Sequence, residues 1–577
     1  MTGILRKQYS MIYGVKMMKH DSKKSNNYTI LKNLISKSRN FKLPDEIDYI
    51  VLYTFLYKYC SDSIRDHFLM ALQDKEMTLD EAYASNYYQE VLKEDAMHLY
   101  GFHIEKPEAF IDEVINNSYS DRFFLSEFFN VFPRNLTFAL NSRESEYFKF
   151  LFQTFQEIIK VDKHEFESEI KLSIKEIIYA ISKLDLFESE FSFDQVFEVL
   201  SSSKLMHIKP TPDYISQLLS SIISCDKTSI EKAYDPFLND GTSLIRLSNE
   251  CELGVTYYGK ESDKLAYCYT ITRFLINHFN LNHVEFRNED ATESIDIDGS
   301  SFDVILSKIP LKIRNYYSSR ENQNIEINKR SKRNELEKVL LNEFNMNSDS
   351  FTKDSELNSA IENLLEKIDV ESYPYLEFTG EYETLKDNEF LFLINLVESL
   401  KDDGVMAISI SQNFLFKNSL KTLRKYLTFE KNYIDAIISI PEEIGRRRTE
   451  VIIVFKKNRT NKAILFIDIS KKYETQKNRV LFPGLFRRNL IFSNETIDKI
   501  KDVYSKKLTI DKFSNLISIT DIEKNEFNLS VSRYVDTFEG KFIKLTDLKK
   551  EKEEIDSNIN ELNLKIEKMM DELNIRF

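Results

Sequence analysis

Three acidic residues follow three successive apolar segments and could together hold a nucleoside. Asp235 ends the first segment and begins the stretch Asp235–Leu244, which opens a helix. Backbone N–H groups at such a strand-to-helix turn suit a nucleotide-like ligand. Glu261 could accept both hydroxyls of a ribose, and Asp290 could accept an adenine amine. An acid after a strand is usually a helix cap or part of a solvated turn. The prediction of a nucleoside site therefore depends on the order and spacing of all three acids.

A fourth apolar segment, Phe302–Leu306, runs into Lys308-Ile309-Pro310-Leu311. A lysine ammonium offers three donors and no acceptor, so Lys308 cannot accept a hydrogen bond unless it is buried and neutral. Two interpretations of this lysine stay open. It is either a solvent-exposed residue at a strand end with no task, or a contact to a DNA phosphate.

The elements that must position these residues alternate between short apolar strands and helices. Such alternation predicts an open parallel sheet with helices on both faces, an α/β fold whose ligands lie at the carboxyl ends of the strands. Thr211-Pro212 precedes the first helix, with Thr211 expected as N-cap and Pro212 at the first helical position. The predicted strands are Lys232–Asp235, Val255–Gly259, Val284–Arg287, Val304–Leu306, Gly404–Ile410, Ile434–Ser439, Val451–Phe455 and Ala463–Ile467, and the predicted helices include Asp213–Ser224, Leu265–Phe279, Phe390–Leu400 and Ser419–Leu427.

The chain before this region has a different pattern. Apolar residues recur at helical spacing, as in Ile47, Ile50, Val51 and Phe55, and indicate an all-helical domain. We therefore predict a mobile N-terminus (1–30), a helical N-terminal domain (31–204), a Rossmann-like domain (205–490) with a charged insertion (315–385), a C-terminal extension (491–540) and a terminal partner helix (541–577).

The terminal segment has the clearest periodicity in the sequence. Ile555, Ile559, Leu562, Ile566 and Met569 follow one another at spacings of four and three, which is the seam of a coiled coil, and Leu573 extends it. Lys552 interrupts the seam before Leu548. We expect this coiled-coil-like helix to pack on a partner helix, either within the chain or on another subunit.

Composition indicates an ordinary soluble protein. The 577 residues are 42% hydrophobic and 30% charged, with a net charge of −14. No apolar run is long enough to span a bilayer, and no signal peptide is recognisable, so we expect the cytoplasm and no membrane contact. Four cysteines without metal-ligand spacing predict reduced thiols and no metal site.

The negative net charge argues against a protein that binds nucleic acid without a partner subunit. One basic stretch, which includes Arg330, Lys332 and Arg333, is a candidate DNA contact within a larger complex. Arg446–Arg448 is a shorter cluster of the same kind. Solvated loops in a lysine-rich chain explain either cluster equally well.

Taken together, these motifs resemble those of the modification (M) subunits of type I restriction-modification systems, which belong to the N6-adenine DNA methyltransferase family. The resemblance covers roughly residues 40–540. Thr211 resembles the first motif, Asp235–Leu244 the cofactor loop D-P-x-x-G-x-G-x-x-L, and Lys308–Leu311 the catalytic tetrad N-P-P-F/Y. Phe390–Phe416, Ile440–Phe455 and Asn525–Asp536 are similar to further segments of the family.

The resemblance implies a Rossmann-like methyltransferase domain and S-adenosylmethionine as cofactor. It assigns cofactor contacts to Thr211, Asp235, Pro236, Asn239, Gly241, Glu261 and Asp290. Asn239 replaces the first glycine of the cofactor loop, although asparagine tolerates a left-handed backbone. We expect its side chain and the charge of Asp240 to crowd a cofactor that bears a carboxylate, so cofactor binding is doubtful.

The catalytic tetrad departs further. In the family, an asparagine oxygen accepts from the target amine, and an aromatic ring stacks on the extruded base. Lys308 has no acceptor, Leu311 has no ring, and Ile309 removes one of two prolines, which leaves Pro310. These departures predict a pseudoenzyme.

Three functions remain open. The first is a catalytically degenerate scaffold in restriction or phage defence, which binds DNA within a complex and a specificity subunit or sister M subunit through the C-terminal helix. The second is an active N6-adenine methyltransferase subunit that acts on duplex DNA. The third is an interaction protein with no DNA role, which the acidic net charge allows.

Overall fold

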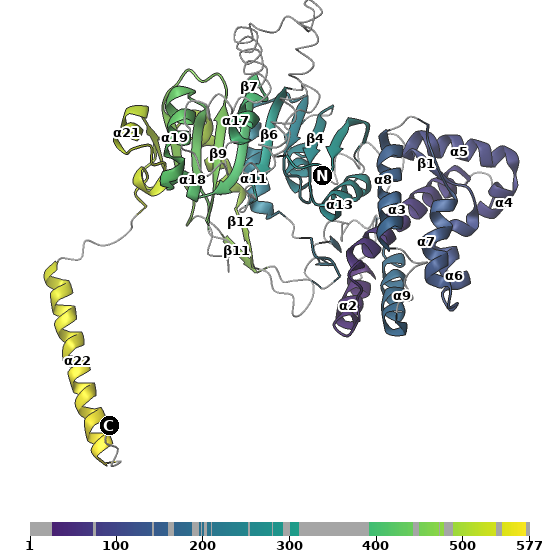
Figure 1. The fold of residues 1–577 in the computed structure, drawn as a ribbon, viewed down its shortest axis with the longest axis horizontal. Helices are drawn as coiled ribbons and strands as arrows, with labels where there is room; N and C mark the ends of the chain where they lie inside the picture. Colours follow the sequence, from purple (N-terminus) through teal and green to yellow (C-terminus); the bar gives the residue numbers. More distant parts are fainter. Residues whose placement is uncertain are drawn as a thin grey trace, which may run out of the picture.

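The structure is a computed structural model, and its arrangement is shown in Figure 1. It describes residues 26–72, 77–140, 143–159, 167–186, 196–197, 199–200, 203, 205–208, 211–251, 254–277, 279, 281–291, 301–310, 392–441, 449–471, 474–477, 488–537 and 545–572.

The N-terminal part is mainly helical and is built around one long buried helix, α3 (Ile47–Leu72). Its side chains are buried around most of its circumference, as expected for a helix enclosed by others. The prediction of an all-helical domain is wrong in one detail, because β1 (Phe102–Ile104) and β2 (Leu136–Phe138) form a small antiparallel sheet. The other helices are α2 (Asn26–Ser38), α4 (Leu79–Ala84), α5 (Asn86–Tyr100), η2 (Pro107–Ala109), α6 (Ile111–Ser118), α7 (Phe124–Arg134), α8 (Arg143–Ile159) and α9 (Ser168–Ser182).

The second part is a nine-stranded sheet in the order β13-β10-β8-β9-β7-β6-β3-β4-β5. The predicted α/β fold is confirmed, but the sheet is not wholly parallel, because β9 runs antiparallel to both β7 and β8 and β13 runs antiparallel to β10. The strands are β3 (Lys232–Asp235), β4 (Thr256–Lys260), β5 (Val284–Arg287), β6 (Phe302–Lys308), β7 (Leu400–Ser411), β8 (Ile434–Ser439), β9 (Glu450–Lys456), β10 (Ile464–Asp468) and β13 (Ser514–Ile517).

Helices cover both faces of this sheet, and each face has its own core. One core joins α11 (Asp213–Asp226), α12 (Thr242–Ser248) and α13 (Lys264–Ile276) to the helical N-terminal part. The other lies under α17 (Phe392–Glu398) and α19 (Lys421–Lys425). Shorter elements near these faces are η3 (Leu281–His283), α18 (Asn413–Phe416), η7 (Asn418–Leu420) and the π-helical turn η8 (Tyr426–Glu430).

The segment that follows the last parallel strand returns to the sheet. α20 (Asn494–Lys506) packs on α11, and β13 adds the outermost strand next to β10. α21 (Ile519–Lys524) and η9 (Val531–Arg533) come after β13, and η9 packs on β8 and β10. A separate two-stranded sheet joins β11 (Glu474–Lys477) to β12 (Arg488–Ile491).

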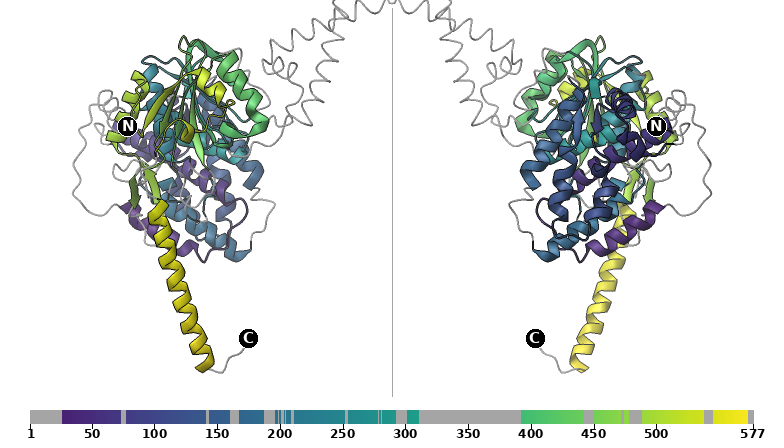
Figure 2. Two further views of the ribbon diagram at one scale, coloured as in Figure 1. Left: turned by 90° about the vertical axis from the view of Figure 1, so that its left-hand side faces the viewer. Right: turned by 90° about the vertical axis from the view of Figure 1, so that its right-hand side faces the viewer.

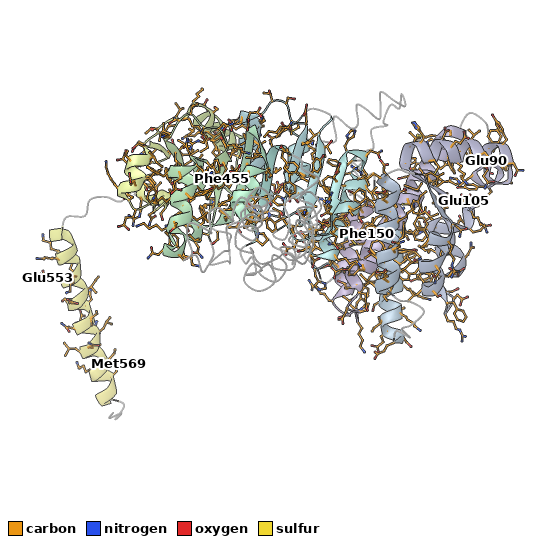
Figure 3. All side chains as sticks on the ribbon, turned by 45° about the horizontal axis from the view of Figure 1, so that its top comes forward. Glu90, Glu105, Phe150, Phe455, Glu553 and Met569 are labelled. Carbon is orange, nitrogen blue, oxygen red and sulfur yellow. The ribbon has the colours of Figure 1, made fainter. Side chains whose placement is uncertain are left out.

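The last helix, α22 (Leu545–Glu572), stands apart from the sheet and the N-terminal helices in Figure 1, and its C-terminal part projects beyond them in Figure 2. Its seam residues are exposed, from 49% at Ile559 to 61% at Met569. The side chains of Glu553 and Met569 project from it without another ribbon beside them (Figure 3). The described residues therefore leave its apolar seam uncovered.

Several predictions lie outside the described residues. They include the mobile N-terminus as far as residue 25, although Asn26–Ile30 already belong to α2, and the whole 315–385 insertion. In the described part of the chain, no helix is long and apolar enough to cross a membrane.

Candidate active site

The candidate site lies where the strand order reverses. β3 has β6 on one side and β4 on the other, so their carboxyl ends meet at a switch point, the usual place for a ligand in such sheets. Asp235 ends β3 with its carboxyl group buried, and the neighbouring Pro236 is buried too. The carboxyl group accepts from Ser307 Oγ at 2.6 Å and from the Phe237 N–H at 3.0 Å. Burial raises its pKa well above the usual range, against the effect of these two donors.

The predicted turn survives the replacement of its first glycine. Asn239 adopts a left-handed backbone with φ 49°, and Gly241 has φ 72°. A Cβ on Gly241 would lie 2.8 Å from a ring carbon of Phe274, so glycine is required there by space as well as by φ. The Asn239 carbonyl accepts from Thr270 Oγ1 at 2.7 Å. The loop is thus fixed on α13.

The charge of Asp240 does not point into the ligand site as expected. The residue is only 1% exposed and faces α13, where Arg273 Nη1 lies 3.3 Å from its carboxylate. The same nitrogen donates to the Asp240 carbonyl and to Thr242 Oγ1, both at 2.7 Å. Because the carboxylate is buried and paired, it does not crowd a ligand at the switch point.

Glu261 lies beside the loop, directly after β4. Its carboxylate accepts from the Asn239 N–H and the Asp263 N–H, each at 2.8 Å. Burial raises its pKa above the usual range, and these backbone donors partly oppose that effect. Asp290 is half-buried after β5, and its neighbour Asn288 donates to the Glu261 carbonyl at 2.7 Å. The three acids therefore lie at the ends of three adjacent strands, as the sequence predicts.

Thr211 joins the site in a different way from the one predicted. Helix α11 begins at Asp213, as predicted, but its N-cap is Pro212 and there is no side-chain capping bond. The Thr211 hydroxyl instead accepts from Asn239 Nδ2 at 3.1 Å. The prediction of Thr211 as N-cap is wrong, and the residue supports the asparagine that replaces the first glycine of the loop.

The positions that resemble the catalytic tetrad begin at Lys308, the last residue of β6, next to this loop. Lys308 is 18% exposed at its side chain, and its Nζ lies 3.0 Å from Glu450 Oε1. This pairing rules out the interpretation of an exposed lysine with no contact. Ile309 is buried, its N–H donates to the Ser409 carbonyl at 2.8 Å, and Pro310 is exposed. Leu311 lies outside the described residues.

Some site residues had no signal in the sequence. Ser307, Arg273 and Glu450 contact predicted site residues through neighbouring strands or helices, and pairings of that kind depend on strand order. A second ion pair lies beside Glu261, where Nζ of the buried Lys260 is 2.9 Å from Oε2 of the exposed Glu289. The candidate DNA contacts Arg330, Lys332 and Arg333, together with Arg446–Arg448, lie outside the described residues.

The described residues contain no group of three side chains suited to hold a metal ion. All four cysteines are free thiols, and Cys60 and Cys268 are buried. Burial raises the pKa of Cys268 to about 12, which keeps that thiol protonated and unreactive.

The site fits an adenosyl cofactor by its donor set. The Glu261 carboxylate lies at the turn, where it accepts from the Asn239 N–H, and Asp290 follows the next strand of the sheet. Carboxylates at neighbouring strand ends are suited to accept from ribose hydroxyls and an adenine amine. What is missing at the end of β6 is an acceptor at position 308.

Much of the chain is similar to known proteins. The N-6 DNA methylase family matches residues 210–348 and 366–541. The methylase subunit of type I restriction enzyme MpnII from Mycoplasma pneumoniae is 24% identical over 458 residues, 75% of this chain and 71% of that protein. The MjaVII methylase subunit from Methanocaldococcus jannaschii is 33% identical over 174 residues, 29% of this chain and 28% of that protein.

Among solved structures, the type I restriction-modification methyltransferase subunit from Streptococcus thermophilus is similar in fold. Its TM-score is 0.62 at 21% identity, with 88% of this chain and 99% of that chain covered.

Proposed function

Since this chain belongs to the N-6 DNA methylase family, with the methylase subunits of type I restriction-modification systems, we propose that it keeps their fold and binding roles without transferring methyl groups. The observation that carries this proposal is the state of Lys308. Its ammonium is engaged by Glu450 at the strand end where the family presents an acceptor.

Methyl transfer to an exocyclic amine needs an acceptor at this position. The amine nitrogen is conjugated to its ring and becomes nucleophilic only as its hydrogens are drawn towards acceptors. Lys308, paired with a carboxylate at 3.0 Å, offers donors alone. Position 311 is a leucine, which lacks the ring on which an extruded base stacks, a contact worth ~1–3 kcal/mol.

The family implies S-adenosylmethionine as cofactor, and we propose that this chain still binds it. Three observations support this binding: the turn at Asn239 and Gly241 is retained, the Asn239 side chain donates to Thr211, and Asp240 is buried against Arg273. Thr211, Asp235, Pro236, Glu261 and Asp290 would complete the site. S-adenosylmethionine supplies a methyl group when bound. Here Glu261 would orient its ribose, and Lys308 would prevent a base amine from being activated.

Isothermal titration with S-adenosylmethionine tests this binding role. The full chain should bind the cofactor, and Glu261→Gln should weaken binding about tenfold, as expected for one lost charged hydrogen bond of ~1.4 kcal/mol or more. Asp263→Asn, at the N-cap of α13, is the matched control, because its side chain bonds to the Ala266 N–H. Absence of binding by the wild-type chain would contradict the proposal.

We further propose that α22 binds a helix of a specificity subunit. Its apolar seam is exposed along the helix, and Lys552 falls on a seam position. Pairing with a second copy in parallel register would bring two Lys552 side chains together, whereas a different helix can place an acid there. A sister M subunit is the competing partner.

Co-purification tests this contact. Ile559→Asp should abolish capture of a co-expressed specificity subunit. Leu564→Asp is the matched control, because Leu564 is 65% exposed on the same helix but lies outside the seam. Equal loss in both variants, or capture of only a sister M subunit, would contradict the assignment.

A DNA role within the complex rests on the basic stretch that includes Arg330, Lys332 and Arg333. Reversing these three charges should weaken DNA binding by the complex and reduce its salt dependence. An unchanged salt dependence would remove this stretch from the DNA contact and favour an interaction protein without a DNA role.

One observation favours the alternative of an active transferase, because the cofactor side of the site keeps its geometry. An assay with tritiated S-adenosylmethionine and the assembled complex separates the alternatives. Labelled adenine in duplex DNA would refute the proposed loss of transfer and leave the partner and cofactor roles intact.

A further inference from the structure

The acid that engages Lys308 comes from a strand two places away. Lys308 pairs in register with Ser409 of β7, and Glu450 pairs with Ser411 on the far side of β7. Residues two places inward, Leu306, Ala407 and Ile452, all belong to one core, so Lys308, Ser409 and Glu450 share that face. The lysine therefore reaches across the end of β7.

Glu450 is held firmly in this position. Its side chain is 9% exposed, and Ser409 Oγ donates to Oε2 at 2.8 Å while Lys308 Nζ lies at 3.0 Å from Oε1. Ser409 itself is fully buried. Lys308 and Glu450 depend on each other, because removing one charge would leave the other largely buried without a counter-charge.

The direction of the pair matters for the site. β3, with Asp235, lies on one side of β6, and β7 and β9 lie on the other. Glu450 thus draws the lysine away from the cofactor loop and across the strand ends next to it. The charged pair therefore lies across the neighbouring ends of β6, β7 and β9.

We propose that Glu450 locks Lys308 across the catalytic strand end, so that the two residues act as one unit that closes this place to a DNA base. This inference rests on the proposed function and extends it, because it adds a residue outside the tetrad. Restoring the tetrad alone leaves the carboxylate of Glu450 buried without its cation. Reopening the strand end therefore requires a change at Glu450 as well as at Lys308.

Acylation of lysines with N-hydroxysuccinimidyl acetate, read by peptide mass spectrometry on the full chain, tests the lock without DNA. Lys308 should react about tenfold more slowly than Lys524, whose side chain is 75% exposed, if the lock is worth ~1.4 kcal/mol. Glu450→Gln should remove most of this difference. Lys260, which is fully buried and paired with Glu289, is the matched control and should stay unreactive. Equal reactivity of Lys308 and Lys524 in the wild-type chain would overturn the lock.

Thermal unfolding of a double-mutant cycle is the second measurement. Lys308→Met and Glu450→Gln should each lower the unfolding temperature. The double variant should lose less than the sum of the two single losses. Additive losses would show that the residues do not act as a unit, which overturns the inference and leaves the proposed function standing.

Base access is the third measurement, made on the assembled complex with duplex DNA that carries 2-aminopurine at the target position. Lys308→Asn with Glu450→Gln should raise the fluorescence on binding, and Lys308→Asn alone should not. An equal rise with the single substitution removes Glu450 from the lock. A rise with the wild-type complex shows that the strand end is open. Transfer of methyl groups by the wild-type complex would instead refute the proposed function.

Discussion

Replacing Arg273 with methionine tests how the cofactor loop tolerates an aspartate after its turn. Arg273 is buried apart from 10% of its side chain, and Asp240 is 1% exposed. The substitution keeps the apolar stem and removes the guanidinium that pairs with the carboxylate at 3.3 Å. Breaking a buried pair in this way typically costs ~3–5 kcal/mol, because it leaves one charge uncompensated.

The second substitution separates charge from hydrogen bonding. Asp240→Asn in the Arg273→Met background removes the stranded charge, but the Asp240 carbonyl and Thr242 Oγ1 still lose their donor. We therefore expect the double variant to recover most of the loss and to keep a deficit of about 1–2 kcal/mol. Cofactor affinity should be highest in the wild-type chain, lower in the double variant and lowest in Arg273→Met.

Urea unfolding followed by circular dichroism measures these differences, since the chain has no tryptophan. The matched control is Arg246→Met, because Arg246 pairs with Asp213 at the surface, where such pairs contribute under about 1 kcal/mol. The reasoning is refuted if Arg273→Met costs no more than this control, or if the double variant is no better than the single one.

Three further predictions concern stability. Burial alone would raise the pKa of Asp435, but three cationic neighbours outweigh it and lower the pKa to about 2. The ionised Asp435 therefore contributes ~2 kcal/mol to the free energy of unfolding above its unfolded pKa of 3.8, and this contribution is lost as the pH falls from 3.8 towards 2. Asp435→Asn should flatten this part of the curve of stability against pH. An unchanged curve would contradict the assignment. Gly241→Ala should lower the melting temperature more than Gly254→Ala, because both have positive φ but only the first Cβ meets a ring, that of Phe274; equal losses would refute the steric argument. Arg424→Met should cost ~2–4 kcal/mol in urea unfolding, because the buried guanidinium donates to three main-chain carbonyls; a loss within 0.5 kcal/mol would show that water replaces it.

Much of the sheet could be predicted from the sequence because buried strands are continuous apolar runs. β3, β5 and β8 match the predicted bounds, and β4, β6, β7, β9 and β10 differ by a few residues at their ends. β13 was not predicted. Strand direction could not be predicted in the same way. β9 is as apolar as its neighbours, and only its pairing with β7 and β8 shows that it runs antiparallel.

The same contrast between predictable and unpredictable features holds for the residues of the candidate site. Asp235, Glu261 and Asp290 could be predicted because strand ends and motif spacing place them at one edge. The orientation of Asp240 and the pairing of Lys308 could not, because each depends on a distant residue, Arg273 or Glu450. The Asp240 carboxylate was expected to face the ligand. It faces the protein interior instead, because Arg273 on the neighbouring helix α13 pairs with it there.

We propose that this protein binds S-adenosylmethionine and does not transfer its methyl group. Both properties can be measured on one preparation of the assembled complex, with tritiated cofactor and duplex DNA that contains the target of its specificity subunit. We expect saturable retention of labelled cofactor by the protein and no tritium in adenine. Tritium at the adenine amine, above the background of a complex without this subunit, would contradict it.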